Sequence, residues 1–592
     1  MLSQFRKTKI ICTMGPATDD DKVLRALIKG GMNVARINMS HGTHEEQKRR
    51  IDKIKQFREE LKKPVAILLD TKGPEIRTGL FKNGKELLQT GQIFTFTTND
   101  CEGDETRCSL SFKGLPKDLK TGDKILVDDG LIEMVVQNIT ETDIECKVIN
   151  EGYIASRKGI NVPGVSLSLP FISETDKADI AFGVEQDLDF IAASFTRTPE
   201  DIFQLRHELS LNNCDNMRII AKIENEEGVH NIDEIIRASD GIMVARGDMG
   251  VEIPLEDVPV IQKRLIKKAY AAGKQVITAT QMLDSMVKNP RPTRAETTDV
   301  ANAIYDGTSA IMLSGETAAG DYPVEALHIM DVIARRTERD IDYVRKFSKR
   351  DISERPDVTS AISHATCTTA HDLGAVAIMT VSKSGLTARE ISKYRPACPI
   401  ICGTTSPKVR RQMNLSWGVV PIMVEEQQNT DALFDHIVKV AKEDEGLVKS
   451  GDLVVITAGI PLGVSGTTNM LKVHLVGNVL VTGTPVNNRN YCGHLCVCST
   501  EQEAEKNFNA GDILVISKTS NNILPLLRTA GGIITEQDGM SSHAAIVAMA
   551  LDKPVIIGAK NATKLLKTGT IVKIDGARGL VFNATGKNAC DI

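Results

Sequence analysis

The 592-residue sequence lacks the features of a membrane protein, a nucleic-acid-binding protein and a disulfide-stabilised secreted protein. No apolar run approaches the roughly 18–20 residues that span a bilayer, so we expect no contact with a membrane. The net charge of −5 argues against a nucleic-acid partner, because surfaces that bind phosphate backbones are strongly basic. The 12 cysteines form no disulfide framework, as is typical of reduced thiols. We therefore expect a cytoplasmic protein.

Two segments superficially resemble other signals. Residues 1–18 contain a short apolar run that ends in a Gly-Pro turn and not at a small-residue cleavage site, so we predict a first strand instead of a signal peptide. Cys492, Cys496 and Cys498 are spaced unlike the usual pairs of zinc ligands, so we predict no zinc site there.

What the sequence does contain is a regular alternation of strands and helices from residue 8 to about residue 345. The whole chain exceeds the roughly 250–300 residues of a single core, so several domains are expected. Eight short apolar strands separated by amphipathic helices predict an α/β fold, the TIM (β/α)8 barrel, whose active site lies at the C-terminal ends of the strands. The predicted strands are 8–14, 33–39, 66–72, 189–195, 217–224, 241–248, 274–281 and 309–316.

Polar residues stand at the C-terminal end of six of these strands, which predicts that they meet at one rim of the barrel and form a catalytic mouth. They are Arg36, Asn38, Ser40 and His41, then Asp70, Thr71 and Lys72, Lys222 and Glu224, Arg246, Gly247 and Asp248, Thr278, Thr280 and Gln281, and Ser314, Glu316 and Thr317.

Lys222 and Glu224 are the most informative pair. Alternate residues of a strand point to the same face, so the ammonium and the carboxylate emerge side by side. Asp248 follows the next strand in a glycine-flanked turn, where backbone can approach a ligand closely. In a set of one lysine between two carboxylates, the carboxylates can hold a divalent metal, for which magnesium is the natural choice. The set can also neutralise a phosphoryl group. The alternative is a plain ion pair at the barrel rim.

The third βα unit is interrupted after Pro74 by about a hundred residues with β-type alternation, for example at 92–98, 124–127 and 144–150. The barrel pattern resumes near Pro170 with a helix predicted at 174–185. An insertion in a βα loop overhangs the active site, so we predict a lid that excludes water from a reactive phosphate. An insertion without such a role is the alternative.

A second α/β pattern follows, with strands at 375–382, 399–403, 419–424 and 452–458. A hydroxyl-rich turn leads from its first strand into a helix predicted at 388–394. Backbone N–H groups and the helix dipole at such a turn can bind an anion, although an ordinary helix cap would look the same. The candidate effector-binding residues are Ser382, Lys383, Ser384, Gly385 and Thr387.

The last unit contains His543 behind a Gly/Ser turn, in the predicted first turn of a helix, followed by a strand at 554–558. A histidine in this position could accept or hold phosphate.

Several of these motifs together resemble the pyruvate kinase family over residues 1 to about 475. The departure at Met39, where the family more often has Phe, changes packing and not a ligand. The matching segments are 36–42, 69–79, 220–225, 243–250 and 279–283.

The tail resembles the swivelling phosphohistidine domain of phosphoenolpyruvate-utilising enzymes. Asp538 replaces a glycine of that pattern, and an extra carboxylate is electrostatically unfavourable beside a phosphohistidine. We therefore expect a structural or regulatory module. The resemblances imply a barrel formed by 1–71 and 170–346, an inserted β-barrel lid at 72–169, an allosteric α/β domain at 347–475 and a mobile domain at 485–592.

The resemblance also implies the reaction, in which phosphoenolpyruvate phosphorylates ADP to give pyruvate and ATP in the last step of glycolysis. Lys222 would stabilise the transferring phosphoryl group, Arg36 would clamp it, and Thr280 would protonate the enolate. Glu224 and Asp248 would bind Mg²⁺ (or Mn²⁺).

The remaining site residues are likewise implied by the resemblance. Arg246 and Gly247, through their backbone, and Asp248 and Thr280 would contact the substrate. K⁺ would bind at Asn38, Ser40, Asp70 and Thr71, and Glu75 matches the potassium-dependent pattern. Nucleotide would bind at Asn38, His41, Arg77 and Lys158. A phosphorylated effector and a homotetramer are also expected.

Two other functions make different demands on the sequence. A dikinase-like enzyme would pass phosphate through His543 and need an ATP-grasp domain, for which the sequence has no candidate. A non-catalytic effector-binding protein would be expected to have lost Lys222, Glu224, Asp248 or Thr280, and all four are present. The sequence therefore favours the kinase.

Overall fold

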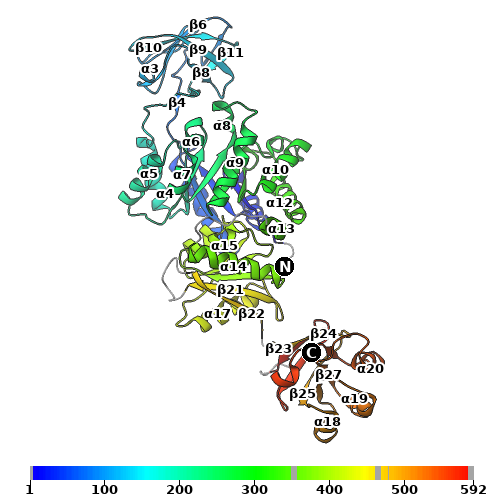
Figure 1. The fold of residues 1–592 in the computed structure, drawn as a ribbon. Helices are drawn as coiled ribbons and strands as arrows, with labels where there is room; N and C mark the ends of the chain where they lie inside the picture. Colours follow the sequence, from blue (N-terminus) through cyan, green and yellow to red (C-terminus); the bar gives the residue numbers. More distant parts are fainter. Residues whose placement is uncertain (1–4, 349–356, 460–467, 478, 585–592) are drawn as a thin grey trace.

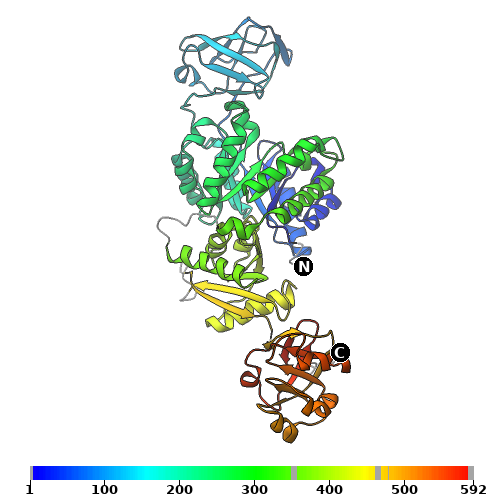
Figure 2. The same ribbon diagram turned by 45° about the vertical axis from the view of Figure 1, so that its right-hand side comes forward.

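The computed structural model describes residues 5–348, 357–459, 468–477 and 479–584. Four bodies follow one another along an elongated molecule, and the inserted β domain and the C-terminal domain lie at opposite ends (Figures 1 and 2). The chain ends assigned to the first and last predicted domains, residues 1–4 and 585–592, lie outside the described residues. In the described part, no helix is both long enough and apolar enough to cross a membrane.

Eight parallel strands close into a barrel in the order β1-β17-β16-β15-β14-β13-β3-β2, which confirms the predicted TIM barrel. All eight predicted strands are present, each shortened by two to four residues. Their bounds are β1 Lys9–Thr13, β2 Val34–Asn38, β3 Ala66–Asp70, β13 Phe190–Ala193, β14 Arg218–Ile223, β15 Gly241–Ala245, β16 Gln275–Ala279 and β17 Ala310–Leu313.

The surrounding helices begin at sequence signals that satisfy their free N–H groups. Thr43 and Glu46 form a capping box at the start of α2, as do Ser173 and Asp176 at α4. Such caps contribute about 0.5–2 kcal/mol each. The principal helices are α1 Asp21–Gly30, α2 His44–Glu60, α4 Glu174–Glu185, α5 Pro199–Leu211, α7 Ile232–Ala238, α9 Val258–Ala271, α10 Arg294–Asp306 and α12 Pro323–Asp340.

Two of the predicted strands include residues that form short helices at the mouth. β15 ends at Ala245, and the next residues form helix α8, Arg246–Glu252, so Asp248 lies in a helical first turn and not in an open loop. Likewise β17 ends at Leu313 and is followed by α11, Gly315–Ala318. The carboxylate of Glu316 accepts hydrogen bonds from the backbone N–H groups of Ser314 and Leu283. Glu316 therefore holds this turn together and does not face the mouth as a free acid.

The inserted domain is a seven-stranded sheet with its own core, which includes Phe94 and Phe96. Its first and last strands are joined by the single bridge Thr78↔Leu110, so the sheet curls into a partly closed barrel. This confirms the predicted β lid. Its strands are β4 Ile76–Arg77, β12 Gly159–Asn161, β8 Lys124–Val127, β9 Ile132–Ile139, β10 Asp143–Val148, β6 Ile93–Thr97 and β7 Arg107–Ser109, beside the pair β5 Lys85–Leu88 and β11 Gly152–Ala155.

The α/β domain has a five-stranded sheet in the order β20-β19-β18-β21-β22. The four predicted strands are present and parallel, and the antiparallel edge strand β22 was not predicted. The strands are β18 Ala377–Val381, β19 Ile400–Thr404, β20 Val419–Met423, β21 Leu453–Gly459 and β22 Thr468–Leu475, with helices α14 Val358–Asp372, α15 Leu386–Lys393, α16 Pro407–Met413 and α17 Thr430–Lys439.

The C-terminal domain is an eight-stranded sheet joined to the α/β domain by an ion pair of Arg578 with Asp452 at 3.3 Å. Helix α20 begins at His543, as predicted. Ten cysteines in the described part of the chain are free thiols, in agreement with the expectation of reduced thiols. The strands are β23 Val479–Thr482, β24 Thr484–Pro485, β25 Asn490–Val497, β26 Ile513–Ile516, β27 Gly532–Thr535, β28 Val555–Ile557, β29 Ile571–Asp575 and β30 Leu580–Asn583, and the longer helices are α18 Glu501–Asn507, α19 Leu524–Thr529 and α20 His543–Leu551.

The barrel and the α/β domain are tied together at the foot of β13. Arg411, in α16, donates from Nε to Oδ1 of Asp189 at 2.7 Å and from Nη2 to Oδ2 of Asp187 at 2.9 Å. Asp189 is fully buried, and burial raises the pKa of its carboxyl even though Arg411 lowers it. Arg411 is therefore the cation that compensates a buried acid.

Replacing Arg411 with Met should leave Asp189 buried without its cation, a change that typically costs about 3–5 kcal/mol. We expect the melting temperature measured by calorimetry to fall by several degrees. Arg410→Met is the matched control, because the closest carboxylate oxygen to Arg410 is 3.8 Å away, on Glu445. Equal melting temperatures for the two variants would contradict the anchoring role of Arg411.

Candidate active site

Charged side chains from three strand ends meet at the barrel mouth. Nζ of Lys222 lies 2.9 Å from Oε1 of Glu224 and 3.2 Å from Oδ1 of Asp70. Arg36 donates from Nε to Oδ2 of Asp70 at 2.6 Å and from Nη1 to Thr13 Oγ1 at 3.1 Å. Residues 36, 70, 222 and 224, predicted from β2, β3 and β14, are therefore brought together.

The charges in this cluster support one another. Burial lowers the pKa of Lys222, but the carboxylates of Asp70 and Glu224 outweigh burial and raise it. Burial raises the pKa of Asp70, but Lys222 and Arg36 bring it below its ordinary value. For Glu224, burial dominates and raises the pKa to about 7, against the opposing effect of Lys222. The lysine therefore stays charged, and the glutamate needs more positive charge to be a stable anion.

Glu224 has one oxygen engaged and one that accepts no hydrogen bond. Oε2 accepts the backbone N–H of Phe195 at 2.6 Å, whereas buried Oε1 has the Lys222 ammonium close by without hydrogen-bond geometry. The negative charge of Asp248 also raises the pKa of Glu224. In the described part of the chain, no three His, Cys, Asp or Glu side chains form a metal cage. A pair of carboxylates suits Mg²⁺, which usually takes its other ligands from phosphate and water.

The four residues predicted to hold potassium lie at the ends of adjacent strands β2 and β3. Asn38 pairs in register with Asp70, and Oδ1 of Asn38 accepts the N–H of Ser40 at 3.1 Å. Thr71 is buried, and its hydroxyl donates to the carbonyl of Ala192 and accepts the N–H of Ser194, both at 3.2 Å, which leaves one hydroxyl lone pair available. The donor set is entirely oxygen, as a hard monovalent cation requires.

The loop after β16 has a strained backbone. Thr280 and Gln281 have φ values of +67° and +53°, and a β-branched residue in this region costs about 1–3 kcal/mol. Oγ1 of Thr280 accepts the N–H of Gly247 at 2.8 Å and donates to the carbonyl of Ala279 at 2.6 Å. These bonds fix the hydroxyl of Thr280 beside the start of α8.

The guanidinium of Arg246 holds this loop in place. It donates to Asp299 at 2.6 and 2.8 Å and to the carbonyl of Thr280 at 2.7 Å. The side chain of Arg246 is therefore occupied by protein partners, and contact of a ligand with the backbone of Arg246 and Gly247 stays a prediction.

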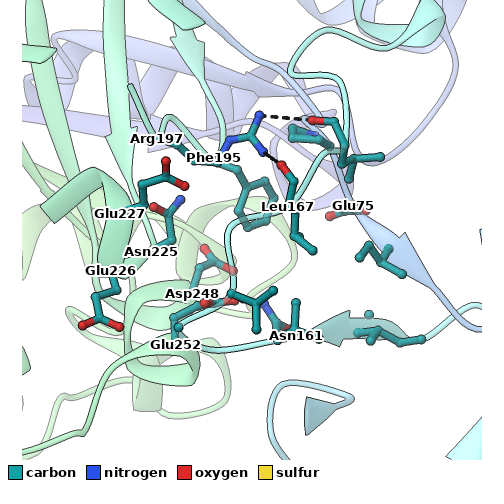
Figure 3. A pocket seen from close by; sticks show the side chains of 18 of the residues that line it. Glu75, Asn161, Leu167, Phe195, Arg197, Asn225, Glu226, Glu227, Asp248 and Glu252 are labelled. Carbon is teal, nitrogen blue, oxygen red and sulfur yellow. Dashed lines mark hydrogen bonds between the residues drawn. The ribbon is translucent and has the colours of Figure 1, made fainter. Parts of the chain in front are cut away.

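A cavity of about 660 Å³ lies between the lid and the barrel. Figure 3 shows Glu75 from the lid side facing Phe195, Asn225 and Asp248 from the barrel. Arg77 and Lys158 both line the cavity from the paired strand ends of β4 and β12, where Gly159 is the register partner of Arg77.

The predicted nucleotide residues are only partly brought together. Arg77 and Lys158 reach the cavity, where they pair with Glu75 at 2.6 Å and with Asp128 at 2.9 Å. Asn38 and His41 follow β2 and are not among the lining residues of the cavity. Their role in nucleotide binding stays a prediction.

Sequence reasoning missed two residues that support the charged cluster. Ser194 accepts a hydrogen bond from Lys222 at 2.8 Å, and Phe195 presents its N–H to Glu224 from a left-handed backbone conformation with φ of +53°. The signal was present, because Ser194 is a polar residue one position before the end of predicted strand 189–195, one of the two predicted strands to which no polar end was assigned.

The predicted effector loop is built around Gly385, which has φ of +75°. A Cβ there would lie 2.5 Å from the sulfur of Met413. Two of the predicted ligands already have partners: Lys383 pairs with exposed Glu426 at 2.8 Å, and the Thr387 hydroxyl contacts that of Thr468 at 2.7 Å. The N–H of Ser382 belongs to the sheet, because it donates to the carbonyl of Gly403.

In the C-terminal domain, both ring nitrogens of His543 have partners. Nδ1 lies 2.9 Å from the hydroxyl of Thr519, and Nε2 lies 2.9 Å from Oδ1 of Asn521. The side chain of Asp538 lies beside Gly558, where an added Cβ would come within 2.8 Å of its carboxyl carbon.

The barrel, its lid and the charged mouth define a class of protein. A buried lysine and an arginine stand among carboxylates at the C-terminal rim of a (β/α)8 barrel, beneath a domain that covers the site. This arrangement is that of a phosphotransferase.

Comparison with known proteins identifies the family. Residues 5–327 match the pyruvate kinase barrel domain, 360–474 the pyruvate kinase alpha/beta domain, and 508–579 the mobile domain of PEP-utilising enzymes. The chain is 47% identical over 581 residues to pyruvate kinase of Sporosarcina psychrophila, covering 98% of this chain and 99% of that protein. It is 48% identical over 579 residues to that of Geobacillus stearothermophilus, covering 98% of each chain.

A solved structure agrees. The crystal structure of a pyruvate kinase from Cryptosporidium parvum superposes with a TM-score of 0.76 at 40% identity, covering 80% of this chain and 97% of that one. The chain belongs to the pyruvate kinase family, whose members transfer the phosphoryl group of phosphoenolpyruvate to ADP in glycolysis, and it catalyses this reaction.

Arg246→Lys should loosen the loop after β16, which contains Thr280. A single ammonium cannot bond both Asp299 and the carbonyl of Thr280 as the guanidinium does. We expect kcat/KM for phosphoenolpyruvate to fall about 10–100-fold, since small misplacements at a reacting centre have effects of this size. The control is Arg237→Lys, at an exposed pair with Glu234. A value within twofold of the wild type would show that the loop does not depend on the guanidinium.

Proposed function

We propose that the transfer of phosphate from phosphoenolpyruvate to ADP in this chain depends on the charged cluster at the barrel mouth, with Lys222 at its centre. The observation that carries the proposal is the position of the Lys222 ammonium, 2.9 Å from Glu224 and 3.2 Å from Asp70. The raised pKa of this lysine keeps it cationic, and a fixed cation stabilises the negative charge that develops on a transferring phosphoryl group.

Glu224 and Asp248 are the proposed ligands of Mg²⁺ (or Mn²⁺). The buried Oε1 of Glu224 accepts no hydrogen bond, which supports a cation beside it. The cavity under the lid adds a second argument, because it carries more acidic than basic side chains and would repel anionic substrates without metal ions. Its charged lining residues are Glu75, Asp128, Asp129, Glu226, Glu227, Asp248 and Glu252 against Arg77, Lys158 and Arg197. When bound, the metal would neutralise phosphate and enolate oxygens.

Arg36 has the geometry of a phosphoryl clamp. Its Nε and Nη1 are occupied by Asp70 and Thr13, so the guanidinium is held in one orientation and can direct its remaining donors at a ligand. Asn38, Ser40, Asp70 and Thr71 are the proposed K⁺ ligands, supported by the all-oxygen donor set at the ends of β2 and β3.

Substrate orientation and proton transfer are assigned to the start of α8 and to the loop after β16. The backbone of Arg246 and Gly247 would bind the carboxylate of the substrate, and Thr280 would deliver a proton to the enolate carbon. The hydrogen bonds of Thr280 to Gly247 and Ala279 support this role because they fix the position of its hydroxyl. Arg77 and Lys158 would bind nucleotide phosphates from the lid.

Lys222→Met is the decisive variant. Removing the cation should lower kcat by about 10³-fold or more, the scale seen for lost transition-state donors, while the melting temperature identifies any unfolded fraction. Turnover coupled to lactate dehydrogenase, with and without Mg²⁺ and K⁺, is the measurement, and wild-type activity should require both cations. Wild-type turnover in the variant, or turnover indifferent to the cations, would refute these assignments.

We also propose allosteric control through the α/β domain, in a homotetramer. The turn Ser382–Thr387 is a candidate site for a phosphorylated effector, and Gly385 in its left-handed conformation gives the close backbone approach that an anion site needs. The ion pair of Lys383 with Glu426 is exposed, so the lysine could exchange Glu426 for a phosphate at little cost.

Lys383→Ala should raise the concentration of a phosphorylated sugar or nucleotide that gives half-maximal activation at least tenfold. Turnover in the absence of effector should not change. Lys472→Ala is the control, because Lys472 lies in the same domain at another ion pair, with Asp431 at 3.5 Å. Unchanged activation curves for Lys383→Ala would exclude this lysine from the effector site.

The C-terminal domain is proposed to be structural or regulatory and not a phosphate carrier. The support is that His543 has hydrogen-bond partners on both ring nitrogens, Thr519 and Asn521, so neither nitrogen is directed at a donor of phosphate. The proposed division at 71/72 and 169/170 is supported by the core of the lid, which is separate from that of the barrel. A cytoplasmic location remains part of the proposal.

A further inference from the structure

Ser194 lies between the catalytic cluster and the chain segment that leads into the lid. It follows β13 and is only 1% exposed. Its Oγ accepts a hydrogen bond from Nζ of Lys222 at 2.8 Å and donates to the carbonyl of Thr71 at 2.7 Å, and it also lies 3.2 Å from Oδ1 of Asp70. A hydroxyl has one proton and two lone pairs, so it can make both bonds at once.

The neighbouring residue supports the same strand, β14. The N–H of Phe195 donates to Oε2 of Glu224 at 2.6 Å, and Phe195 adopts the left-handed conformation that directs this N–H inward. The dipeptide 194–195 therefore contacts both charged residues at the end of β14, the lysine through a side chain and the glutamate through the backbone.

The same dipeptide packs against the entrance to the lid. Gly73 has φ of +73°, and a Cβ at this position would lie 2.8 Å from Cβ of Ser194. Thr71 donates its N–H to the carbonyl of Ala192 at 3.1 Å, and its hydroxyl accepts the N–H of Ser194 at 3.2 Å. Residues 71–73 and 192–194 are therefore joined by a continuous set of bonds at the place where the chain leaves the barrel.

We propose that Ser194 is a positioning residue that holds the ammonium of Lys222 against the lid-entry segment 71–73. The proposal rests on the role of Lys222 given above. Without the hydroxyl, the partners of the ammonium in the described part of the chain are the carboxylates of Asp70 and Glu224. Ser194 thus offers the ammonium a neutral acceptor that does not compete for its charge.

Ser194→Ala tests the proposal at saturating Mg²⁺ and K⁺. We expect kcat to fall about 10–100-fold while KM for phosphoenolpyruvate stays within threefold, and Ser194→Thr, which keeps a hydroxyl, should recover most of the loss. Ser416→Ala is the matched control, because Ser416 is also 1% exposed and accepts a hydrogen bond from Gln275 at 2.9 Å, at the barrel end distant from the mouth. Its kcat should stay within twofold of the wild type.

A double variant separates positioning from a general structural effect. Because Ser194 acts through Lys222, adding Ser194→Ala to Lys222→Met should cause no further loss, whereas a purely structural role would lower both backgrounds equally. Should Ser194→Ala fail to fold, Ser194→Cys keeps the volume with a weaker hydrogen-bonding group and should show the same selective loss of kcat.

These experiments distinguish an error in the role of Lys222 from an error in the role of Ser194. If Lys222→Met turns over normally, the role of the lysine itself is wrong. If Lys222→Met is inactive and folded Ser194→Ala keeps its kcat within twofold, or if Ser194→Thr is as impaired as Ser194→Ala, the positioning role of the Ser194 hydroxyl is overturned.

Discussion

The site depends on keeping an ammonium charged inside a protein. Removing one partner of such a buried pair typically costs several kcal/mol, so Lys222 remains a cation only because Asp70 and Glu224 surround it. Those carboxylates in turn need Arg36, a backbone N–H and, by our proposal, metal ions. The barrel supplies this arrangement through the convergence of strand ends, which brings residues distant in sequence within hydrogen-bond distance. Each member stabilises its neighbours, so the cluster is in place before any substrate arrives.

Much of this architecture could be predicted from sequence because its determinants are local. Apolar runs of strand length, helix caps such as Thr43 with Glu46, and polar strand ends predicted the eight barrel strands, the helices and the contact between Lys222 and Glu224. The lid was found because β-type alternation interrupted a regular βα pattern. His543 was correctly expected at the start of a helix, since a serine precedes it as N-cap.

The remaining features depend on tertiary contacts that leave little trace in a local pattern. The short helix α8 was taken for strand because the apolar run before it continues into Arg246, whose guanidinium is bound by distant Asp299. The left-handed conformation of Thr280 is contrary to the preference of a β-branched residue and persists only because Gly247 and Arg246 bind the loop. The edge strand β22 alternates partly exposed residues, so its pattern was too weak to recognise.

The order of the barrel strands has a consequence for how the chain is made. β1 pairs on one side with β2 and on the other with β17, which begins at Ala310. The barrel therefore cannot close until about half of the chain has been synthesised. The lid can fold as soon as residues 76–161 have been synthesised, because its strands lie within this range and bury their own core. During synthesis on the ribosome, the insert can therefore fold while the barrel around it is still open.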